Sequence, residues 1–377
     1  MQFRDLKAQY QRYKEEIDSA IQKVLNETAF IGGPEVKELE EELSAYTGAG
    51  HCITCANGTE AMTLVLLAWG IGPNDVVFVP DFTFFSTGEV VSFIGATPVF
   101  VDVDPRTFNL DPLKLEQALD KVKAEGRLNP KAVIPVDLFG LPADYPAIEN
   151  IAASNNLLVL EDGAQGFGGR IGERKALSFG HAATTSFFPA KPLGCYGDGG
   201  AIFTADGNLA EHIKSLKVHG KGTHKYDNVR IGLNSRLDTI QATVLKAKLK
   251  AFIAFELESV NQVYTQYNKL LSGLVDVPFI PDGYYSSFAQ YTIKLNDRSE
   301  RDNLQAHLKE AGIPSAVYYQ KPMHSQEAFA GLAYSGGDYP VTTRLCDTVL
   351  SLPMHPYLSE ADLTCVGKAV EEFIRRR

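Results

Sequence analysis

The strongest constraint on the fold is an alternation of short apolar runs and helical patterns between residues 60 and 204. The apolar runs are rich in β-branched and aromatic residues, which favour strands, and lie at 76–79, 98–101, 132–136, 157–160, 184–188 and 201–204. Patterns with helical spacing separate them at 60–69, 86–94, 111–123 and 143–155. Apolar strands that alternate with helices form parallel sheets covered on both faces, so the sequence predicts an α/β fold with a mostly parallel central sheet.

The alternation stops at a long helical segment over 235–271, and a second unit follows it. A chain of 377 residues is long enough for two domains. The second unit opens with an expected strand at 288–295 and closes with an expected helix at 359–376. We therefore predict a large domain over 1–250 and a smaller C-terminal α+β domain over 251–377.

Charge and composition exclude several classes of protein. The net charge of −10 argues against nucleic-acid and membrane-surface binding, and no apolar run approaches the roughly 20 residues that span a bilayer. The N-terminus lacks the apolar core of a signal peptide, so a cytoplasmic protein is expected. Cys52 and Cys55 have C-x-x-C spacing, but we expect them on opposite faces of a buried strand. We predict neither a disulfide nor a metal site there.

Because ligands of open parallel sheets bind at the carboxyl ends of strands, the strand-to-helix junctions are the places to look for a site. Gly58 and Thr59 follow a strand that ends at Cys55 and begin a helix. The free N–H groups and positive dipole end of such a helix suit a phosphate. A simple helix cap is the alternative explanation for this motif.

Two further junctions carry ionisable groups. Asp162 ends an apolar strand, where a buried carboxylate needs a cationic partner unless it only caps the next turn. Lys191 lies between Pro189 and Pro192, ahead of a glycine-rich loop. A partly desolvated lysine there would have a lowered pKa and could form a Schiff base with an aldehyde, whereas a solvated surface lysine would need neither proline.

An anion site, a strand-end aspartate and a later lysine together match the requirements of pyridoxal 5'-phosphate. The helix N-terminus, helped by Ser186, would take the phosphate; Asp162 would keep the pyridine nitrogen protonated; and Lys191 would hold the aldehyde. An aromatic residue from the stretch 80–87 would cover the ring.

Seven stretches, in their order and spacing, resemble the DegT/DnrJ/EryC1/StrS family of pyridoxal phosphate-dependent nucleotide-sugar aminotransferases over almost the full chain. They are Phe3-Arg4-Asp5-Leu6, 30–36, Asn57-Gly58-Thr59-Glu60-Ala61, Glu161-Asp162-Gly163-Ala164-Gln165, 186–191, 234–238 and Pro322-Met323-His324. The resemblance implies the aspartate-aminotransferase fold (fold type I) and a homodimer with shared active sites.

The resemblance also implies roles for individual residues. Lys191 is the Schiff-base lysine, and Asp162 pairs with the pyridine nitrogen. Gln165 and Phe84 lie on opposite faces of the ring. The phosphate is held by Gly58, Thr59 and Ser186, joined by Asn234 from the other subunit.

For the substrate, the resemblance is strongest to the branch that transfers an amino group from L-glutamate to a UDP-linked 3-keto N-acetyl-hexuronate in bacterial surface polysaccharide assembly. A dTDP-linked 3-keto-6-deoxyhexose and a UDP-linked 4-keto-6-deoxyhexose are alternatives. The candidate substrate-binding residues are Arg236, His219, Arg230, Tyr318, Tyr319 and His324. The family often has His-Tyr in place of Tyr318-Tyr319.

Two other functions are weighed against this one. Sugar dehydratases of the same family carry histidine in place of the Schiff-base lysine, so Lys191 argues against dehydration. A non-catalytic relative is expected to have lost Lys191 or Asp162, and both are present.

Overall fold

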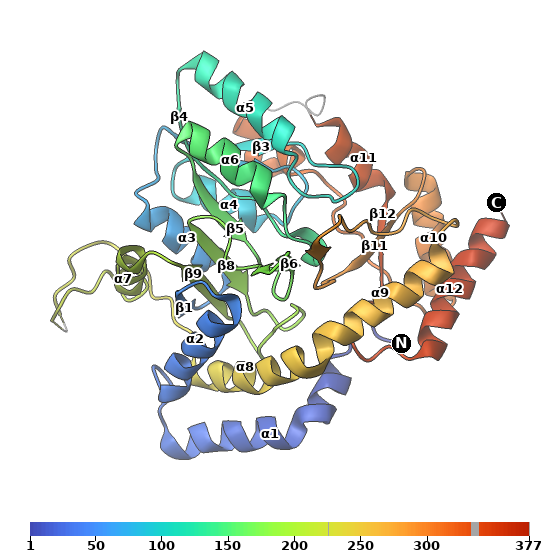
Figure 1. Cartoon of the computed structure of the whole chain (residues 1–377), viewed down its shortest axis with the longest axis horizontal. Helices are drawn as coiled ribbons and strands as arrows, with labels where there is room; N and C mark the ends of the chain where they lie inside the picture. The colour runs from blue at the N-terminus through green and yellow to red at the C-terminus, as the bar shows by residue number, and fades with distance from the viewer. Residues whose placement is uncertain (225, 333–338, 377) are drawn as a thin grey trace.

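The computed structural model describes residues 1–224, 226–332 and 339–376 (Figure 1). A seven-stranded sheet forms the centre, in the order β1-β9-β8-β5-β4-β2-β3. Neighbouring strands are parallel from β8 to β3, whereas β9 is antiparallel to both β1 and β8. The strands are β1 (His51–Cys55), β2 (Asp75–Pro80), β3 (Thr97–Val101), β4 (Asn129–Val133), β5 (Leu158–Asp162), β8 (Ala182–Ser186) and β9 (Gly200–Thr204). The predicted mostly parallel sheet is confirmed.

Helices cover both faces of this sheet, as predicted (Figure 1). One face packs against α3 (Gly58–Ala68), α4 (Ser86–Phe93) and α7 (Gly207–Leu216). The other packs against α2 (Pro34–Thr47), α5 (Pro112–Glu125), α6 (Tyr145–Asn155) and α8 (Thr239–Ala251). Helix α1 (Leu6–Glu27) lies along α8. Cys52 and Cys55 are buried free thiols in two different core clusters, so they face opposite sides of the sheet as expected.

Two boundaries differ from the sequence prediction for local reasons. Strand β4 ends at Val133 rather than 136, and Pro135, which has no N–H to donate to a ladder, follows it closely. The long helical segment begins at Thr239 and is interrupted at Phe252–Glu256 by a π-helical segment before α9 (Leu257–Leu271). It still runs as one continuous rod across the molecule (Figure 1).

A separate apolar core lies between residues 260 and 370, within the predicted second domain. Its antiparallel pair is β11 (Tyr291–Lys294) and β12 (Val349–Leu352), which packs with α9, α10 (Arg298–Glu310) and α12 (Glu360–Arg375). The boundary at residue 250 itself stays a prediction. The shorter elements are β6 (Arg170–Ile171), β7 (Arg174–Lys175), β10 (Tyr284–Tyr285), α11 (Pro340–Thr348) and the 3-10 turns Leu138–Gly140, Met323–Ser325 and Glu327–Leu332.

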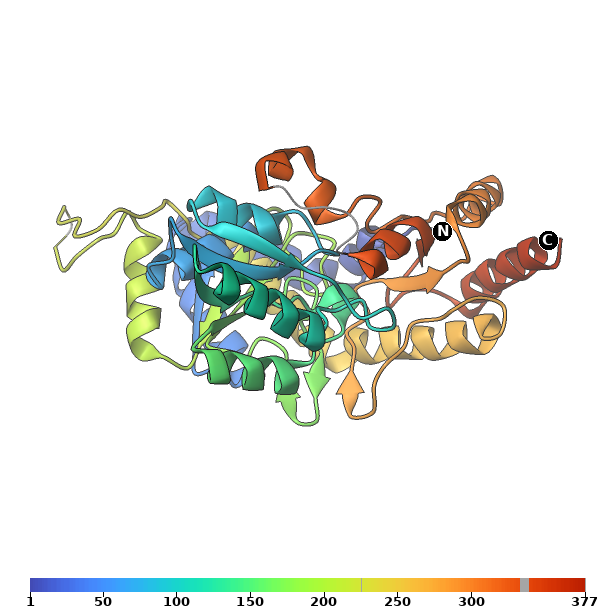
Figure 2. The same cartoon turned by 90° about the horizontal axis from the view of Figure 1, so that it is seen from above.

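The loop between α7 and α8 projects from the molecule as an arm, which we define as residues 217–224 and 226–236. The arm and α12 lie at opposite ends of the longest axis (Figures 1 and 2). None of the helices within the described ranges combines the length and the apolar character needed to cross a membrane.

Candidate active site

Strands β1 and β8 lie on either side of β9, and the predicted phosphate site forms where β1 and β8 end. Asn57 caps α3, since its side-chain oxygen accepts a hydrogen bond from the backbone N–H of Glu60 at 2.8 Å. Gly58 is the first residue of that helix, and a Cβ atom added to it would lie only 2.9 Å from the Cβ of Ser186. The structure therefore brings Gly58 and Ser186, predicted to share the phosphate, into direct contact, and it does so only because residue 58 has no side chain.

Asp162 ends β5 and is 4% exposed. Its carboxylate accepts hydrogen bonds from the hydroxyl of Thr87 at 2.9 Å and from the backbone N–H of Ala164 at 3.2 Å. Burial raises the pKa of Asp162, and both the Thr87 hydrogen bond and the charge of Lys191 pull it back. The carboxylate has two neutral hydrogen-bond donors and one nearby amine, which do not fully compensate its buried charge. A protonated ring nitrogen would supply the missing positive charge.

Lys191 lies in the loop that follows β8, and it is partly buried. Burial lowers its pKa, the charge of Asp162 raises it, and the charge of Arg4 lowers it further. A lysine whose amine is pushed toward the neutral form is a better nucleophile and a better proton acceptor. The guanidinium of Arg4 donates to the backbone carbonyl of Lys191 at 3.0 Å.

Gln165 and Phe84 both lie beside Tyr319. The Gln165 side chain is buried, accepts a hydrogen bond from the N–H of Phe139 at 2.8 Å and donates to the hydroxyl of Tyr319 at 3.2 Å. The ring of Phe84 is 54% exposed, and its centroid lies 6.5 Å from that of Tyr319. Tyr319 thus lies between a buried amide and a large exposed aromatic ring, and an exposed ring of this kind can cover a flat ligand.

The three predicted substrate contacts from the second domain have different surroundings. Tyr319 lies beside Gln165, as described above, and the ring of Tyr318 packs edge-on against Phe3 with centroids 6.2 Å apart. The His324 ring is buried, and its Nδ1 lies 2.6 Å from a carboxylate oxygen of Asp81. The backbone N–H of His324 also donates to Asp81 at 2.8 Å. Its ring therefore fixes the loop after β2, which leads to Phe84, and Nδ1 is not free for a substrate.

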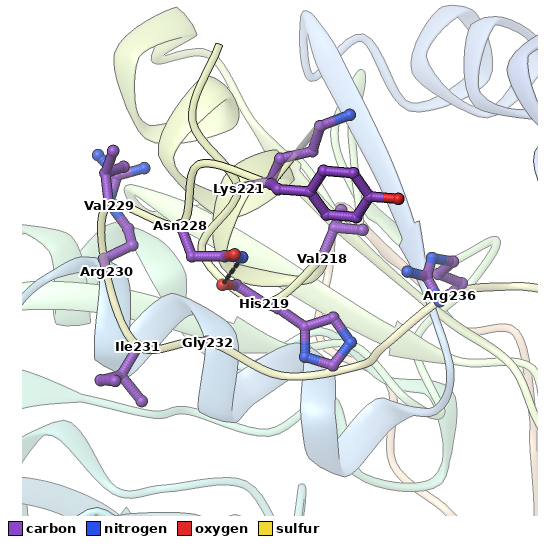
Figure 3. Close-up of a pocket in the computed structure, with 10 residues that line it drawn as sticks. Val218, His219, Lys221, Asn228, Val229, Arg230, Ile231, Gly232 and Arg236 are labelled. Carbon is purple, nitrogen blue, oxygen red and sulfur yellow. Dashed lines mark hydrogen bonds between the residues drawn. The ribbon is translucent and has the colours of Figure 1, made fainter. Parts of the chain in front are cut away.

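The remaining candidates lie on or next to the arm, around an open pocket of about 950 Å³ (Figure 3). His219 and Arg236 face this pocket together with Lys221, and Arg230 lies on its opposite side from Arg236 (Figure 3). Asn228 donates to the carbonyl of His219 at 2.8 Å, and this hydrogen bond joins the outgoing and returning segments of the arm. The pocket therefore gathers four basic side chains on one projecting loop.

Asn234 is exposed and accepts a hydrogen bond from the guanidinium of Arg236. It lines a cavity of about 320 Å³ with Thr59 and Phe93, but within the described ranges it has no hydrogen bond to Ser186 or Lys191. The Arg236 guanidinium donates to the side chain of Asn234, and no ion pair in the described part of the chain joins it to the nearby Asp238. The single chain thus leaves the side chains of Asn234 and Arg236 directed to its surface.

The residues of the predicted site fit pyridoxal phosphate. Gly58 and Ser186 pack at a helix N-terminus, a buried carboxylate lacks a full cationic partner, and a lysine of lowered pKa follows on the same edge of the sheet.

Two residues of the site were not predicted from the sequence. They are Thr87, which donates a hydrogen bond to Asp162, and Asp81, which holds His324. The hydroxyls of Thr83 and Thr87 lie 3.2 Å apart, but Thr83 precedes α4, so helical spacing in the sequence gave no signal for this polar pair.

Comparison with known proteins gives one consistent result. The model of the DegT/DnrJ/EryC1/StrS aminotransferase family matches residues 11–371. The chain is 44% identical to the UDP-2-acetamido-2-deoxy-3-oxo-D-glucuronate aminotransferase of Pseudomonas aeruginosa, covering 98% of this chain and 99% of that protein. It is 40% identical to the UDP-N-acetyl-3-dehydro-alpha-D-glucosamine 3-aminotransferase of Acidithiobacillus ferrooxidans, covering 97% and 96%.

A crystal structure of a DegT/DnrJ/EryC1/StrS aminotransferase from Brucella abortus superposes on the chain with a TM-score of 0.96. It is 50% identical in sequence, and the match covers 99% of each chain. Motifs, fold and site geometry thus agree with the comparisons over nearly the whole length. The chain belongs to the DegT/DnrJ/EryC1/StrS aminotransferase family.

Proposed function

We propose that the chain transfers an amino group from L-glutamate to the keto carbon of a UDP-linked 3-keto N-acetyl-hexuronate, as a step in bacterial surface polysaccharide assembly. The substrate assignment rests on the 44% identity to the Pseudomonas UDP-2-acetamido-2-deoxy-3-oxo-D-glucuronate aminotransferase, which extends over nearly the full length of both chains. The basic pocket on the arm supports it, because a nucleotide-linked uronate carries negative charge on both its diphosphate and its sugar.

Transamination in this family depends on pyridoxal phosphate, which supplies an electron sink when it is bound. The roles of the residues follow from their surroundings. Gly58, Thr59 and Ser186 would bind the phosphate of the cofactor, Asp162 would hold a proton on its ring nitrogen, and Lys191 would bind its aldehyde and move protons at the reacting carbon. Phe84 and Gln165 would contact the ring, as the resemblance to the family implies.

We further propose a homodimer in which Asn234 and Arg236 complete the site of the partner subunit. The arm supports this assembly, since it projects from the molecule and exposes 94% of Ile231 together with much of Tyr226 and Val229 (Figure 2). An exposed apolar cluster of this kind is typical of a surface that another chain covers. The cytoplasmic location expected from the sequence stays a prediction.

The substrate assignment is tested with a panel of four keto sugars and L-glutamate, by measuring amino-sugar and 2-oxoglutarate formation. The panel contains the UDP-linked 3-keto N-acetyl-hexuronate, the UDP-linked 3-keto N-acetyl-glucosamine, a dTDP-linked 3-keto-6-deoxyhexose and a UDP-linked 4-keto-6-deoxyhexose. We expect the highest kcat/KM for the uronate. A higher value for either 6-deoxyhexose would replace the proposed substrate with one of the alternatives.

A separate measurement distinguishes an enzyme from a non-catalytic relative. The purified protein is expected to show a visible absorbance band that borohydride bleaches and that depends on Lys191. Absence of the band after incubation with pyridoxal phosphate would argue for a scaffold that has lost its chemistry.

A further inference from the structure

Two cations from distant parts of the chain reach the backbone of the loop that carries Lys191. The guanidinium of Arg4, just before α1, donates to the carbonyl of Lys191 at 3.0 Å and to that of Pro192 at 3.5 Å. The ammonium of Lys248, on α8, donates to the carbonyl of Gly194. Three of the four carbonyls between residues 191 and 194 are therefore held by positive charges.

Lys248 is removed from water, and Arg4 is partly removed from it. Lys248 is 2% exposed, and burial lowers its pKa to about 8. Burial also lowers the pKa of Arg4. The buried carboxylate of Glu256 opposes both shifts, and it is itself held by Gln9, which donates at 2.9 Å, and by the hydroxyl of Tyr357. Glu256 closes the π-helical segment, a distortion often found at functional sites.

Neither cation forms an ion pair within 4 Å among the described residues. Their hydrogen-bond acceptors are carbonyl oxygens, and the Lys248 ammonium also lies 5.3 Å from the centroid of the Tyr196 ring. If the chain needed only stability here, apolar side chains of similar volume would serve at least as well. The two cations instead fix the conformation of the loop, because each holds particular carbonyl groups of its backbone. The loop is also closed internally, since the N–H of Cys195 donates to the carbonyl of Phe187 at 2.8 Å.

We propose that Arg4 and Lys248 are positioning residues that clamp the backbone of residues 191–194, so that the Lys191 side chain alone moves during amino transfer. The inference rests on the proposed role of Lys191. Arg4 has a second effect through its charge, because it lowers the pKa of the Lys191 amine. The clamp thus fixes the backbone position from which the Lys191 side chain extends, and it favours the neutral form of the Lys191 amine.

Hydrogen exchange of the purified enzyme, followed by mass spectrometry, tests the clamp without using activity. We expect Arg4→Leu and Lys248→Met each to speed exchange in the peptide containing 191–195 by about tenfold, and to leave the strand peptide 75–80 unchanged. The matched controls are Lys7→Leu, an exposed position one turn from Arg4, and Lys250→Met, an exposed position on α8. Both controls are expected to exchange like the wild type.

The pH dependence of kcat/KM tests the charge effect. Removing the Arg4 charge raises the pKa of Lys191, so the acid limb of the profile should move to higher pH in Arg4→Leu. Arg4→Lys keeps the charge and one donor, and should restore most of both the profile and the slow exchange. Circular dichroism and thermal unfolding of every variant establish that it is folded.

Wild-type exchange in the loop of folded Arg4→Leu and Lys248→Met would overturn the clamp. So would equal acceleration in the two controls, or Arg4→Lys behaving like Arg4→Leu. Failure of the proposed function gives a different result, because the wild type would then form no amino sugar from the keto-sugar panel, whatever the loop's exchange rate.

Discussion

Asp162 and Lys191 are both pushed toward their neutral forms by burial, and each partly offsets the shift of the other. Buried acid–base pairs of this kind, at the carboxyl ends of the strands, are characteristic of catalytic sites. A chain selected for stability alone has no reason to bury them. Thr87 adds a neutral donor to Asp162 at 2.9 Å, which orients the carboxylate without satisfying its charge.

The first prediction concerns Lys191→Ala. The variant should keep pyridoxal phosphate through the phosphate site and Asp162, because neither involves the lysine side chain. It should lose at least ~10²-fold in kcat, since it lacks both the nucleophile and the proton carrier. Cofactor content after dialysis and single-turnover rates measure the two effects. Turnover near the wild-type rate would remove Lys191 from the mechanism.

The second prediction concerns Asp162→Asn, which keeps the shape of the side chain but cannot hold a proton on the ring nitrogen. We expect kcat to fall by about 10²-fold, as for other lost electrostatic contacts at reacting groups, and cofactor occupancy to fall much less. If the variant instead loses stability and keeps its specific activity, Asp162 only caps the turn after β5.

The third prediction concerns the buried ammonium of Lys248. Its pKa in the folded chain is about 8, below the ordinary value of 10.5, so the unfolded chain binds more protons between these two values. The wild type should therefore gain stability from this group as pH rises from about 8 to 10.5, by up to about 3 kcal/mol. Lys248→Met lacks this gain. Denaturant unfolding of both proteins at pH 7.5 and 10 checks it, and parallel pH profiles would contradict it.

At the scale of whole elements, the sequence was informative where the physics is local. Strand and helix periodicity predicted the central sheet, and the junctions after β1, β5 and β8 predicted Gly58, Asp162 and Lys191. It was uninformative where the partner lies far along the chain. Arg4 and Lys191 are 187 positions apart, and Asp81 and His324 are 243 apart, so only the folded topology brings them together. The structure shows that Asp81 holds Nδ1 of His324, whereas the role of His324 as a substrate contact stays a prediction.

The arm is the element that carries the fourth prediction. If Arg236 reads the carboxylate of a uronate, Arg236→Lys loses the bidentate geometry but keeps the charge. We expect transition-state binding to weaken by more than ~1.5 kcal/mol, about 12-fold in kcat/KM, for the UDP-linked 3-keto uronate. The loss should be much smaller for the matching 6-deoxy sugar. Equal losses on the two substrates would show that Arg236 does not read the carboxylate.

At the scale of the whole molecule, the fifth prediction tests whether two chains share each site. Lys191→Ala and Asn234→Ala chains, each impaired alone, should regain activity when mixed, because a hybrid dimer contains one site with both residues intact. Random pairing restores about one quarter of all sites. Demonstrated heterodimers without recovered activity would count against a shared site, provided that Asn234→Ala alone is impaired.

The reversed direction of β9 has a consequence for how this fold tolerates change. Ser186 at the end of β8 pairs directly with Gly200 at the start of β9, so the chain between them leaves and re-enters the sheet at adjacent positions. Closing a loop between fixed neighbours costs little more entropy when the loop grows, so added residues would not unfold the protein. They would, however, change the reach of Lys191. Relatives should therefore keep a constant number of residues between Ser186 and Gly200.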